Sequence, residues 1–367
     1  MKIGILGTRG IPNNYGGFEQ FAEYFSVYLK EKGHDVYVYS SSTHTYQEKQ
    51  YKGVNIIHCK DPEHKIGTVG QFVYDFYCIH DARKRNFDVI LQLGYTSSSV
   101  WRRYLPKRSM IVTNMDGLEW KRTKFSRKVQ KFLKYAESLG VKGSHHLIAD
   151  SLGIQDYLKE TYNVESRYIP YGSTVFDDPD RETLSEYKIE PYSYHMLIAR
   201  MEPENSIETI LDGYVESGSN EPFLVVGKHD VNKFGAYLKD KFKGYQNVRF
   251  LGGIYDLEKL NNLRYFSKLY FHGHTVGGTN PSLLEAMGSN ALIVAHNNKF
   301  NAAILEQDGL YFRNKEEVSG VINEVKNKEA FSGYLANNTN KIKEKFNWDL
   351  INKSYLDYFE EKFAEFK

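Results

Sequence analysis

Cysteine is nearly absent from this chain of 367 residues, and long hydrophobic runs are absent altogether. The two cysteines, Cys59 and Cys78, lack the spacing of metal ligands, so we expect free thiols in a reducing cytoplasm rather than a disulfide framework. No stretch approaches the ~20 apolar residues of a membrane span. Residues 1–7 lack the basic start and long apolar core of a secretion signal. We therefore expect a cytoplasmic protein, either free or peripheral at the inner face of the plasma membrane.

Acidic residues are missing from one segment, between positions 120 and 137. Residues 1–175 carry 25 Lys and Arg against 17 Asp and Glu, whereas residues 176–367 carry 23 against 29. Val129, Phe132 and Leu133 recur at helical spacing, which predicts an amphipathic helix over 127–134 with a basic face. This face is either ordinary solvated surface or is attracted to an anionic membrane. We expect no nucleic-acid binding, because no recognition motif accompanies the cations Lys121, Arg122, Lys124, Arg127, Lys128, Lys131 and Lys134.

The length of the chain exceeds what one hydrophobic core usually supports, so we expect two domains. Apolar strands alternate with helical segments on both sides of a polar, proline-broken stretch, and this alternation predicts parallel sheets built from βαβ units. The sequence thus predicts an α/β fold with a Rossmann-like domain over 1–172, a linker over 173–193, a second Rossmann-like domain over 194–345, and a helix over 346–367 that packs back on the first domain.

The expected elements follow from apolar runs and helical periodicity. In the first domain they are strands at Lys2–Leu6, Asp35–Ser40, Val54–His58, Val89–Gln92, Ser109–Thr113, His146–Ala149 and Ser166–Ile169, with a helix over Phe18–Lys32. In the second domain they are strands at His195–Ala199, Phe223–Val226, Val248–Leu251, Lys268–His272 and Ala291–Ala295, with helices over Ile207–Ser217, Leu257–Phe266 and Ser282–Gly288. The final helix is expected over Trp348–Phe366.

A glycine-rich turn leads directly into a helix over residues 272–287, HGHTVGGTNPSLLEAM. Such a turn aims unpaired backbone N–H groups and the positive helix end at one point, which suits a phosphate. Glu285, one turn inside the helix, can accept hydrogen bonds from a sugar hydroxyl. The segment therefore predicts a nucleotide-sugar site. His272 and His274 either touch the donor or are structural, and their spacing is a weak metal signal without a third ligand nearby.

Two further turns follow predicted strands. The first carries glycines that let a ligand approach the backbone or simply make a tight turn, Gly7, Gly10, Gly16 and Gly17. A dinucleotide fingerprint fails there, because Arg9 stands where a glycine is required. In the second turn Arg200 ends a strand, where its rigid guanidinium suits the oxygens of a leaving diphosphate, unless it pairs with Glu202 or Glu204.

The Gly16-Gly17 loop, Arg200 and the helix start over 280–287 together resemble the GT-B glycosyltransferases of family 4, in matching order across nearly the whole chain. Residues 114–122, NMDGLEWKR, and 276–281, VGGTNP, resemble the subgroup that carries an N-terminal domain of unknown function, DUF1972, and includes bacterial β-1,4-rhamnosyltransferases. The resemblance implies two Rossmann-like domains facing across a cleft. It implies retaining, metal-free transfer of a hexosyl group, with L-rhamnose from dTDP-rhamnose passing to a lipid-diphosphate-linked glycan in capsule or exopolysaccharide synthesis.

The resemblance also implies site residues, and no cofactor beyond the nucleotide-sugar substrate. The donor would be held by Gly16, Gly17, Arg200, Asn205, His274, Gly278, Thr279, Asn280, Pro281, Ser282, Leu283 and Glu285. The catalytic residues would be Arg200, Glu285 and Asp116. The acceptor or membrane side would carry Glu119, Lys121, Arg122, Lys124, Arg127 and Lys128. Asp116 and Glu119 either orient the acceptor hydroxyl or merely cap a helix and pair with neighbouring cations.

Two positions depart from the family-4 pattern. Gly277 stands where an acid contacts the donor sugar, and Asn205 stands where a lysine supports the diphosphate. These departures fit either a different donor sugar or an inactive copy. Two alternatives to transfer therefore stay open, a GT-B nucleotide-sugar epimerase and a catalytically silent nucleotide-sugar-binding protein.

Overall fold

The computed structural model describes residues 1–14 and 16–367, and its contacts divide the chain into two compact units. Unit 1 comprises residues 1–121, 125–171 and 348–367. Unit 2 comprises residues 122–124 and 172–347. Neither unit is a single continuous segment, because three residues of the first half belong to unit 2 and the last helix belongs to unit 1.

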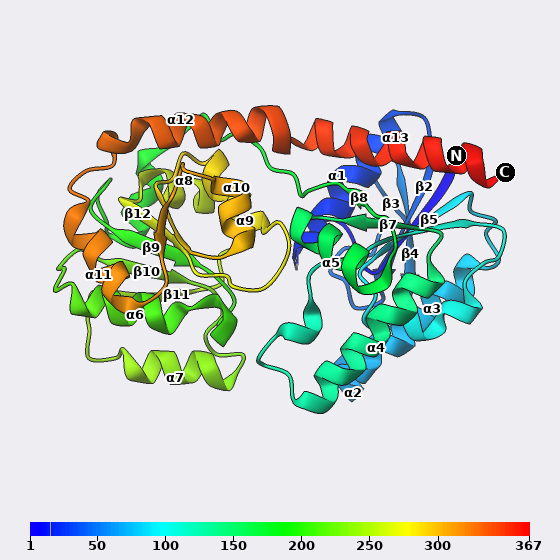
Figure 1. Cartoon of the computed structure of the whole chain (residues 1–367), viewed down its shortest axis with the longest axis horizontal. Helices are drawn as coiled ribbons and strands as arrows, with labels where there is room; N and C mark the ends of the chain where they lie inside the picture. The colour runs from blue at the N-terminus through cyan, green and yellow to red at the C-terminus, as the bar shows by residue number, and fades with distance from the viewer. Residues whose placement is uncertain (15) are drawn as a thin grey trace. The chain divides into compact units, whose positions relative to one another are not determined.

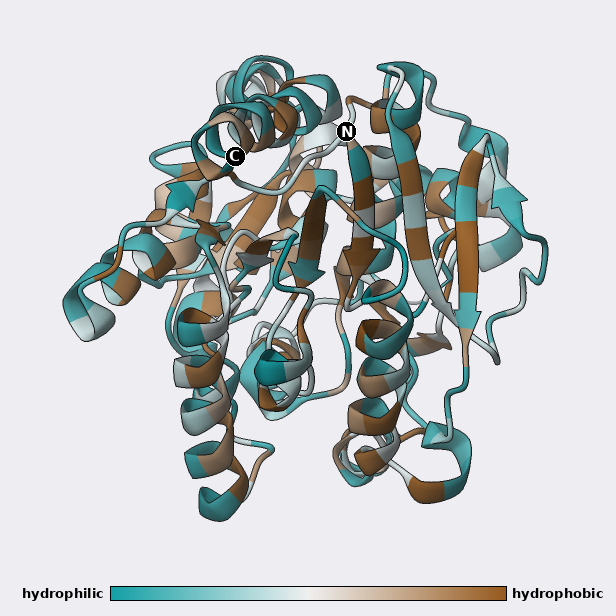
Figure 2. Cartoon of the chain, turned by 90° about the vertical axis from the view of Figure 1, so that its right-hand side faces the viewer, coloured by the Kyte–Doolittle hydropathy of each residue, from teal (hydrophilic) through white to brown (hydrophobic). Residues whose placement is uncertain are grey.

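Unit 1 contains an eight-stranded sheet in the order β3-β4-β2-β1-β5-β6-β7-β8. All neighbouring strands are parallel except β3 and β4. Parallel strands are covered on both faces, which explains why they are nearly continuous apolar runs; Figure 2 shows these strands as largely hydrophobic ribbons between helices. The strands are β1 (Lys2–Leu6), β2 (Asp35–Ser41), β3 (Gln50–Tyr51), β4 (Val54–Cys59), β5 (Val89–Leu93), β6 (Met110–Asn114), β7 (His146–Ala149) and β8 (Arg167–Tyr168).

The C-terminal helix α13 (Trp348–Phe366) packs on unit 1, beside α1 (Gly17–Glu31) (Figure 1). The ring of Tyr355 lies 4.6 Å from that of Phe21 and 5.2 Å from that of Phe25, all within one buried cluster. The Tyr355 hydroxyl also accepts a hydrogen bond of 2.8 Å from Asn114 Nδ2. The expectation that this helix packs back on the first domain is confirmed. The remaining helices of unit 1 are α2 (Glu63–Ile66), α3 (Val69–Ala82), α4 (Arg127–Gly143) and α5 (Leu152–Tyr162), with 3₁₀ turns η1 (Ser99–Tyr104) and η2 (Glu119–Lys121).

Unit 2 contains a six-stranded, fully parallel sheet in the order β11-β10-β9-β12-β13-β14. Its strands are β9 (His195–Ile198), β10 (Phe223–Val226), β11 (Val248–Gly252), β12 (Leu269–His272), β13 (Ile293–His296) and β14 (Leu310–Phe312). Its helices are α6 (Ile207–Glu216), α7 (Lys233–Lys241), α8 (Leu257–Phe266), α9 (Pro281–Gly288), α10 (Lys299–Leu305), α11 (Lys315–Glu324) and α12 (Ser332–Lys341). Shorter turns are η3 (Arg181–Tyr187), η4 (Pro203–Asn205), η5 (Glu329–Phe331) and η6 (Ile342–Phe346).

The strands and helices expected from the sequence are confirmed to within two residues at each end, with one exception. The basic helix continues past residue 134 to Gly143. Its start at Arg127 follows from Ser126, whose hydroxyl accepts from the Val129 amide as an N-cap. Cys59 and Cys78 are buried and unbridged. Among the residues that the structure describes, no helix is both long and apolar enough to cross a bilayer.

Candidate functional site

In unit 2, the loops that follow β9 and β12 are tied together at the carboxyl edge of the sheet. The two strands are parallel neighbours, so both loops leave the same edge. Thr275 donates to the Glu204 carbonyl from its amide at 3.0 Å and from its hydroxyl at 2.8 Å. A Cβ at Gly273 would lie 2.1 Å from the Asn205 carbonyl oxygen, so only glycine permits this approach. The structure thus places the Arg200 turn against the glycine-rich turn.

Arg200 is exposed at this edge, and within the described residues its side chain makes no ion pair or hydrogen bond. The two acids considered as its partners pair elsewhere: Lys124 Nζ lies 3.4 Å from Glu202, and Arg122 Nη1 lies 3.6 Å from Glu204. Asn205 is buried, and its Nδ2 donates to the Arg200 carbonyl at 2.7 Å. Asn205 therefore fixes the turn, while the Arg200 guanidinium remains accessible.

His272 and His274 stack on one another at the end of β12, with ring centroids 4.4 Å apart. Burial, assisted by the nearby Arg200 and Arg122 guanidinium groups, lowers the pKa of His274 to about 3. Burial also holds the pKa of His272 well below its usual value. Both rings are therefore neutral at physiological pH. Within the described part of the chain, neither His272 ring nitrogen has a hydrogen-bond partner, and no group of three metal-ligating side chains is found.

At the start of α9, some backbone N–H groups already donate hydrogen bonds to an acceptor of the same segment. Asn280 caps the helix: its Oδ1 accepts from the Ser282 amide at 3.0 Å, and its carbonyl accepts from the Leu283 amide at 3.0 Å. The Ser282 and Leu283 amides are therefore already paired within the helix start. Leu283 and Thr279 are buried, Pro281 occupies the first turn, and the Ser282 hydroxyl bonds to that of Tyr270 at 2.7 Å.

Gly277 and Gly278 form the turn just before α9. Gly277 has a φ of +135°, which residues with a side chain rarely adopt, and a Cβ there would face open space. Gly277, at the position where the resemblance expects an acid, therefore has a backbone conformation in which a residue with a side chain would be strained. Gly278 is half-buried beside it.

Glu285 is paired inside unit 2 with Arg264, a residue of α8. The Arg264 side chain is only 1% exposed, and its Nη2 lies 2.5 Å from Glu285 Oε2. Arg264 Nη1 also donates to Asn261 Oδ1 at 3.0 Å, and that oxygen accepts from the Ser289 hydroxyl. This network holds the Glu285 carboxylate in one orientation.

In unit 1, the glycines of the first turn divide into two kinds. A Cβ at Gly7 would lie 2.3 Å from the Leu93 carbonyl oxygen, and one at Gly10 would lie 2.5 Å from the Ser40 hydroxyl, so both serve internal packing. A Cβ at Gly16 would meet only Glu19 Oε2, at 3.4 Å. Gly16 caps α1 without a side chain, and Gly17 begins the helix. Internal packing therefore does not require glycine at position 16.

Acids gather at the carboxyl edge of the unit 1 sheet. Arg9 pairs with Glu63 and lies 3.9 Å from Asp61. Burial raises the pKa of Asp75 to about 6, against the opposing effects of the Ser97 hydroxyl, which donates to it at 2.6 Å, and of Arg9. Glu19, also buried, accepts from the Arg9 amide at 2.8 Å. This edge thus carries several carboxyl groups around one arginine.

Asp116 and Glu119 follow β6 in the same unit, and both are half-buried. Asp116 has a φ of +51°, and its amide donates to Asn114 Oδ1 at 2.9 Å. Burial, Glu137 and then these two acids raise the pKa of the Tyr95 hydroxyl. The structure therefore brings Asp116 and Glu119 together around Tyr95.

The buried Glu137 of α4 organises the elements beside these acids. It accepts hydrogen bonds from three tyrosine hydroxyls, an indole and an ammonium group: Tyr95, Tyr157, Tyr162, Trp120 and Lys134, at 2.5 to 3.2 Å. One carboxylate thus fixes α4, α5 and η2 relative to one another. This role could not be predicted, because nothing in the local sequence pattern distinguishes Glu137 from the other acids of the chain.

The cations expected on the acceptor or membrane side separate into two groups. Arg122 and Lys124 belong to unit 2, where they pair with Glu204 and Glu202. Lys121, Arg127 and Lys128 are exposed in unit 1, the last two in the first turn of α4. Arg122 and Lys124 are thus paired with acids of unit 2, whereas the second group forms an exposed basic surface on unit 1.

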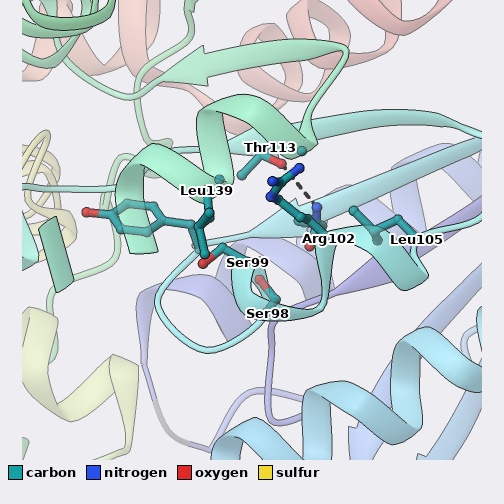
Figure 3. A pocket seen from close by; sticks show the side chains of 10 residues that line it. Ser98, Ser99, Arg102, Leu105, Thr113 and Leu139 are labelled. Atoms are coloured by element: carbon teal, nitrogen blue, oxygen red, sulfur yellow. Dashed lines mark hydrogen bonds between the residues drawn. The ribbon is translucent and has the colours of Figure 1, made fainter. Parts of the chain in front are cut away.

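One small pocket in unit 1 lies between η1 and α4 (Figure 3). Its volume of about 10 Å³ is lined by Ser98, Ser99, Arg102, Leu105, Thr113 and Leu139, among others. That volume admits about one water molecule and is far too small for a sugar. It therefore belongs to the interior of unit 1.

Comparison with known proteins agrees with this architecture. Residues 1–174 match the family described as a domain of unknown function, DUF1972, as the sequence resemblance implied. Among solved structures, sucrose-phosphate synthase from Thermosynechococcus elongatus is 16% identical, with a TM-score of 0.79 and 99% of each chain covered. Its fold, and that of this chain, is GT-B. A search of curated protein sequences gives no significant match.

Two further structures show the same fold. HepE from Anabaena, solved in complex with UDP-glucose, is 13% identical, with a TM-score of 0.78 over 98% of this chain and 99% of HepE. WaaG, a glycosyltransferase involved in lipopolysaccharide biosynthesis, is 15% identical, with a TM-score of 0.70 over 96% of this chain and 98% of WaaG. At these identities the likeness establishes the GT-B fold of the chain.

Proposed function

We propose that the chain is a glycosyltransferase that takes its sugar from a nucleoside-diphosphate donor. The observation that carries this proposal is the exposed Arg200 guanidinium at the carboxyl edge of the unit 2 sheet, beside a neutral His274. Ligands of parallel α/β sheets bind at this edge, and a guanidinium fits two phosphate oxygens at once. The complex of HepE with UDP-glucose supports the proposal, because that ligand is held on the same fold.

In the proposed reaction, the bond between the sugar C1 and the donor phosphate oxygen breaks, and the acceptor oxygen bonds to C1. The acceptor proton passes to the departing diphosphate. Arg200 stabilises the negative charge that develops on this leaving group. Glu285, oriented by Arg264, accepts hydrogen bonds from the sugar hydroxyls. Asp116, whose backbone is held by Asn114, orients the acceptor hydroxyl.

For the donor sugar we propose L-rhamnose, carried by dTDP. The resemblance of residues 114–122 and 276–281 to rhamnosyltransferases supports this choice. The positive φ of Gly277 supports it as well, because it disfavours an acid at the position that contacts hydroxyls of other sugars. A 6-deoxy sugar presents a different set of hydroxyls and needs a different set of contacts.

For the acceptor we propose a lipid-diphosphate-linked glycan in surface polysaccharide synthesis, reached from an anionic membrane. Exposed apolar side chains of unit 1 support this location: Ile66 and Val69 are 51% and 63% exposed around the turn between α2 and α3. Val69 lies one turn before Phe72, whose ring is 5.7 Å from that of Phe132 on α4. The tip of α3 and the exposed face of α4 therefore adjoin.

Charge on the same surface favours anionic lipid. Lys65, Arg127, Lys128 and Lys131 are exposed around these apolar side chains, and residues 121–136 include no acid. Arg127 and Lys128 stand in the first turn of α4, where the helix dipole disfavours cations by ~0.3–1 kcal/mol each. An anionic surface would contribute about 1 kcal/mol per basic residue and remove this cost.

The activity is tested with purified protein in two steps. A thermal-shift panel of dTDP-, UDP- and GDP-sugars should give its largest stabilisation with the preferred donor, by mass action. Transfer is then followed by NMR with and without a lipid-diphosphate-linked acceptor. Acceptor-dependent sugar transfer supports the proposal, a changed donor without acceptor supports an epimerase, and binding without turnover supports a silent binding protein.

The membrane location is tested by co-sedimentation with vesicles of neutral phosphatidylcholine, with and without anionic phosphatidylglycerol. We expect pelleting with the anionic vesicles only, and its loss in the double variant Lys128→Glu/Lys131→Glu. The matched control Lys239→Glu/Lys243→Glu changes two exposed lysines of unit 2 and should pellet like the wild type. Equal pelleting with both kinds of vesicle would contradict this location.

A further inference from the structure

Arg122 lies in unit 2, although the residues before it and after Lys124 belong to unit 1. Thr123 Oγ1 donates to Glu204 Oε2 at 3.4 Å, and Lys124 Nζ lies 3.4 Å from Glu202. The segment 122–124 therefore lies along the turn between β9 and α6. This is the same turn that carries Arg200.

Arg122 and Arg200 both act on the imidazole of His274. After burial, these two guanidinium groups are the causes that lower the pKa of that ring. Arg122 pairs with Glu204, which stands in the turn between β9 and α6 that also carries Arg200, so both guanidinium groups belong to this turn. Two like charges held near one another repel, and the repulsion is strong where water is partly excluded. An anion bound between them would relieve it.

The acid beside Arg122 balances only one of the two charges. Glu204 is 1% exposed and Arg122 is 14% exposed, and their closest atoms, Nη1 and Oε1, are 3.6 Å apart. This distance is an ion pair but exceeds a hydrogen bond. Among the described residues, Glu204 Oε1 has no hydrogen-bond partner. Glu204 thus pairs with Arg122 and Glu202 with Lys124, whereas among the described residues no acid is paired with Arg200.

We propose that Arg122 is a second guanidinium contact for the diphosphate of the donor, acting together with Arg200. The proposal rests on the proposed function and deepens it, by assigning to the diphosphate a residue that the sequence placed on the acceptor or membrane side. A nucleoside diphosphate carries one phosphate more than the monophosphate. Arg122 should therefore matter for the diphosphate and matter little for the monophosphate.

The test is isothermal titration calorimetry with UDP, dTDP and GDP and with the corresponding monophosphates. For the diphosphate that binds the wild type, we expect Arg122→Gln to weaken binding by about tenfold or more, because one charge-assisted contact is lost. The same variant should change binding of the monophosphate less than about threefold. Arg122→Lys, which keeps the charge without the planar fork, should recover part of the loss.

A second variant separates ligand binding from simple pairing with Glu204. The double variant Arg122→Gln/Glu204→Gln removes both charges, so it leaves no uncompensated buried carboxylate. It should bind the diphosphate as weakly as Arg122→Gln, while circular dichroism and Tm confirm folding. Arg181→Gln is the matched control, since it removes an exposed arginine of unit 2 that pairs with Glu190, and it should bind like the wild type.

If Arg122→Gln binds the diphosphate as tightly as the wild type, or if the double variant regains wild-type affinity, Arg122 does not contact the diphosphate. The proposed function would still stand. Failure of the wild type to bind any nucleoside diphosphate would overturn the proposed function and this inference with it.

Discussion

The carboxyl edges of the two sheets differ in charge although both sheets are mainly parallel and flanked by helices. The edge of unit 1 gathers the carboxyl groups of Glu19, Asp61, Glu63 and Asp75 around a single arginine, Arg9. The edge of unit 2 gathers three guanidinium groups beside two neutral histidines: that of Arg200, and those of Arg122 and Arg264, which pair with Glu204 and Glu285.

This difference in charge comes from the loops that follow the strands and not from the strands themselves. In both units the strands supply the apolar core, and the charged side chains follow the strand ends. A cationic edge suits a diphosphate, whereas an edge of carboxyl groups suits the hydroxyl groups of an acceptor.

Removing the exposed guanidinium of unit 2 should abolish transfer without affecting the fold. We expect Arg200→Ala to lower kcat/KM by about 10²–10³-fold, because a preorganised contact to the leaving group is lost. The Tm should stay within a degree or two, since the side chain makes no ion pair in the described structure. Arg181→Ala, with the same loss of charge elsewhere in unit 2, should keep full activity. Wild-type turnover in Arg200→Ala would show that unit 2 does not bind phosphate through this residue.

Removing the buried arginine of unit 2 should cost stability as well as activity. Arg264→Met leaves the Glu285 carboxylate without its cation, and breaking such a pair costs about 3–5 kcal/mol. Chemical denaturation should show this loss, and the double variant Arg264→Met/Glu285→Gln should recover most of it. If the double variant is no more stable than Arg264→Met, the two side chains are not coupled.

Removing one acid of unit 1 should instead raise stability, with a defined pH dependence. The pKa of Asp75 is raised from 3.8 to about 6, chiefly by burial, so the folded state holds a proton that the unfolded state has already lost. Stability is therefore lost as the pH rises from about 4 to 6. We expect Asp75→Asn to raise the Tm by about 5 °C above pH 7, with no difference from the wild type below pH 4.

Asp81 lies on the same helix and provides a control, because its pKa is shifted in the opposite direction to that of Asp75. Although burial acts to raise its pKa, hydrogen bonds from Arg85 and Tyr39 lower it below 3.8. Asp81→Asn should therefore lower the Tm at neutral pH, and the difference should vanish in acid. A pH-independent effect in both variants would contradict the assigned pKa directions.

Most of the sheet strands could be predicted from the sequence because parallel strands are buried on both faces and read as apolar runs, as in β5 and β10. Elements with weak patterns were missed. The helix α3 is rich in aromatic and β-branched residues, and α12 contains SGYLANNTNK, which has little apolar periodicity. Tertiary packing decides the structure of both segments.

The candidate site was predictable where one residue follows a strand, as for Arg200, and not where partners come from distant segments. Arg264 precedes Glu285 by 21 positions, and no sequence pattern in α8 predicts that the two side chains pair. Likewise, the run of cations over 121–134 predicts a single basic surface. In the structure, Arg122 and Lys124 instead pair with Glu204 and Glu202, some 80 residues later in the chain. The sequence also did not reveal that Asn280 satisfies amides of its own helix.

The position of α13 has a consequence for how the chain is made. Trp348, Ile351, Tyr355 and Phe359 complete the same cluster as Phe21 and Phe25, so the core of unit 1 includes residues synthesised after all of unit 2. During translation the first sheet must wait, with one apolar face uncovered, until these final residues leave the ribosome. A chaperone that shields that face in the interval would increase the yield of folded protein.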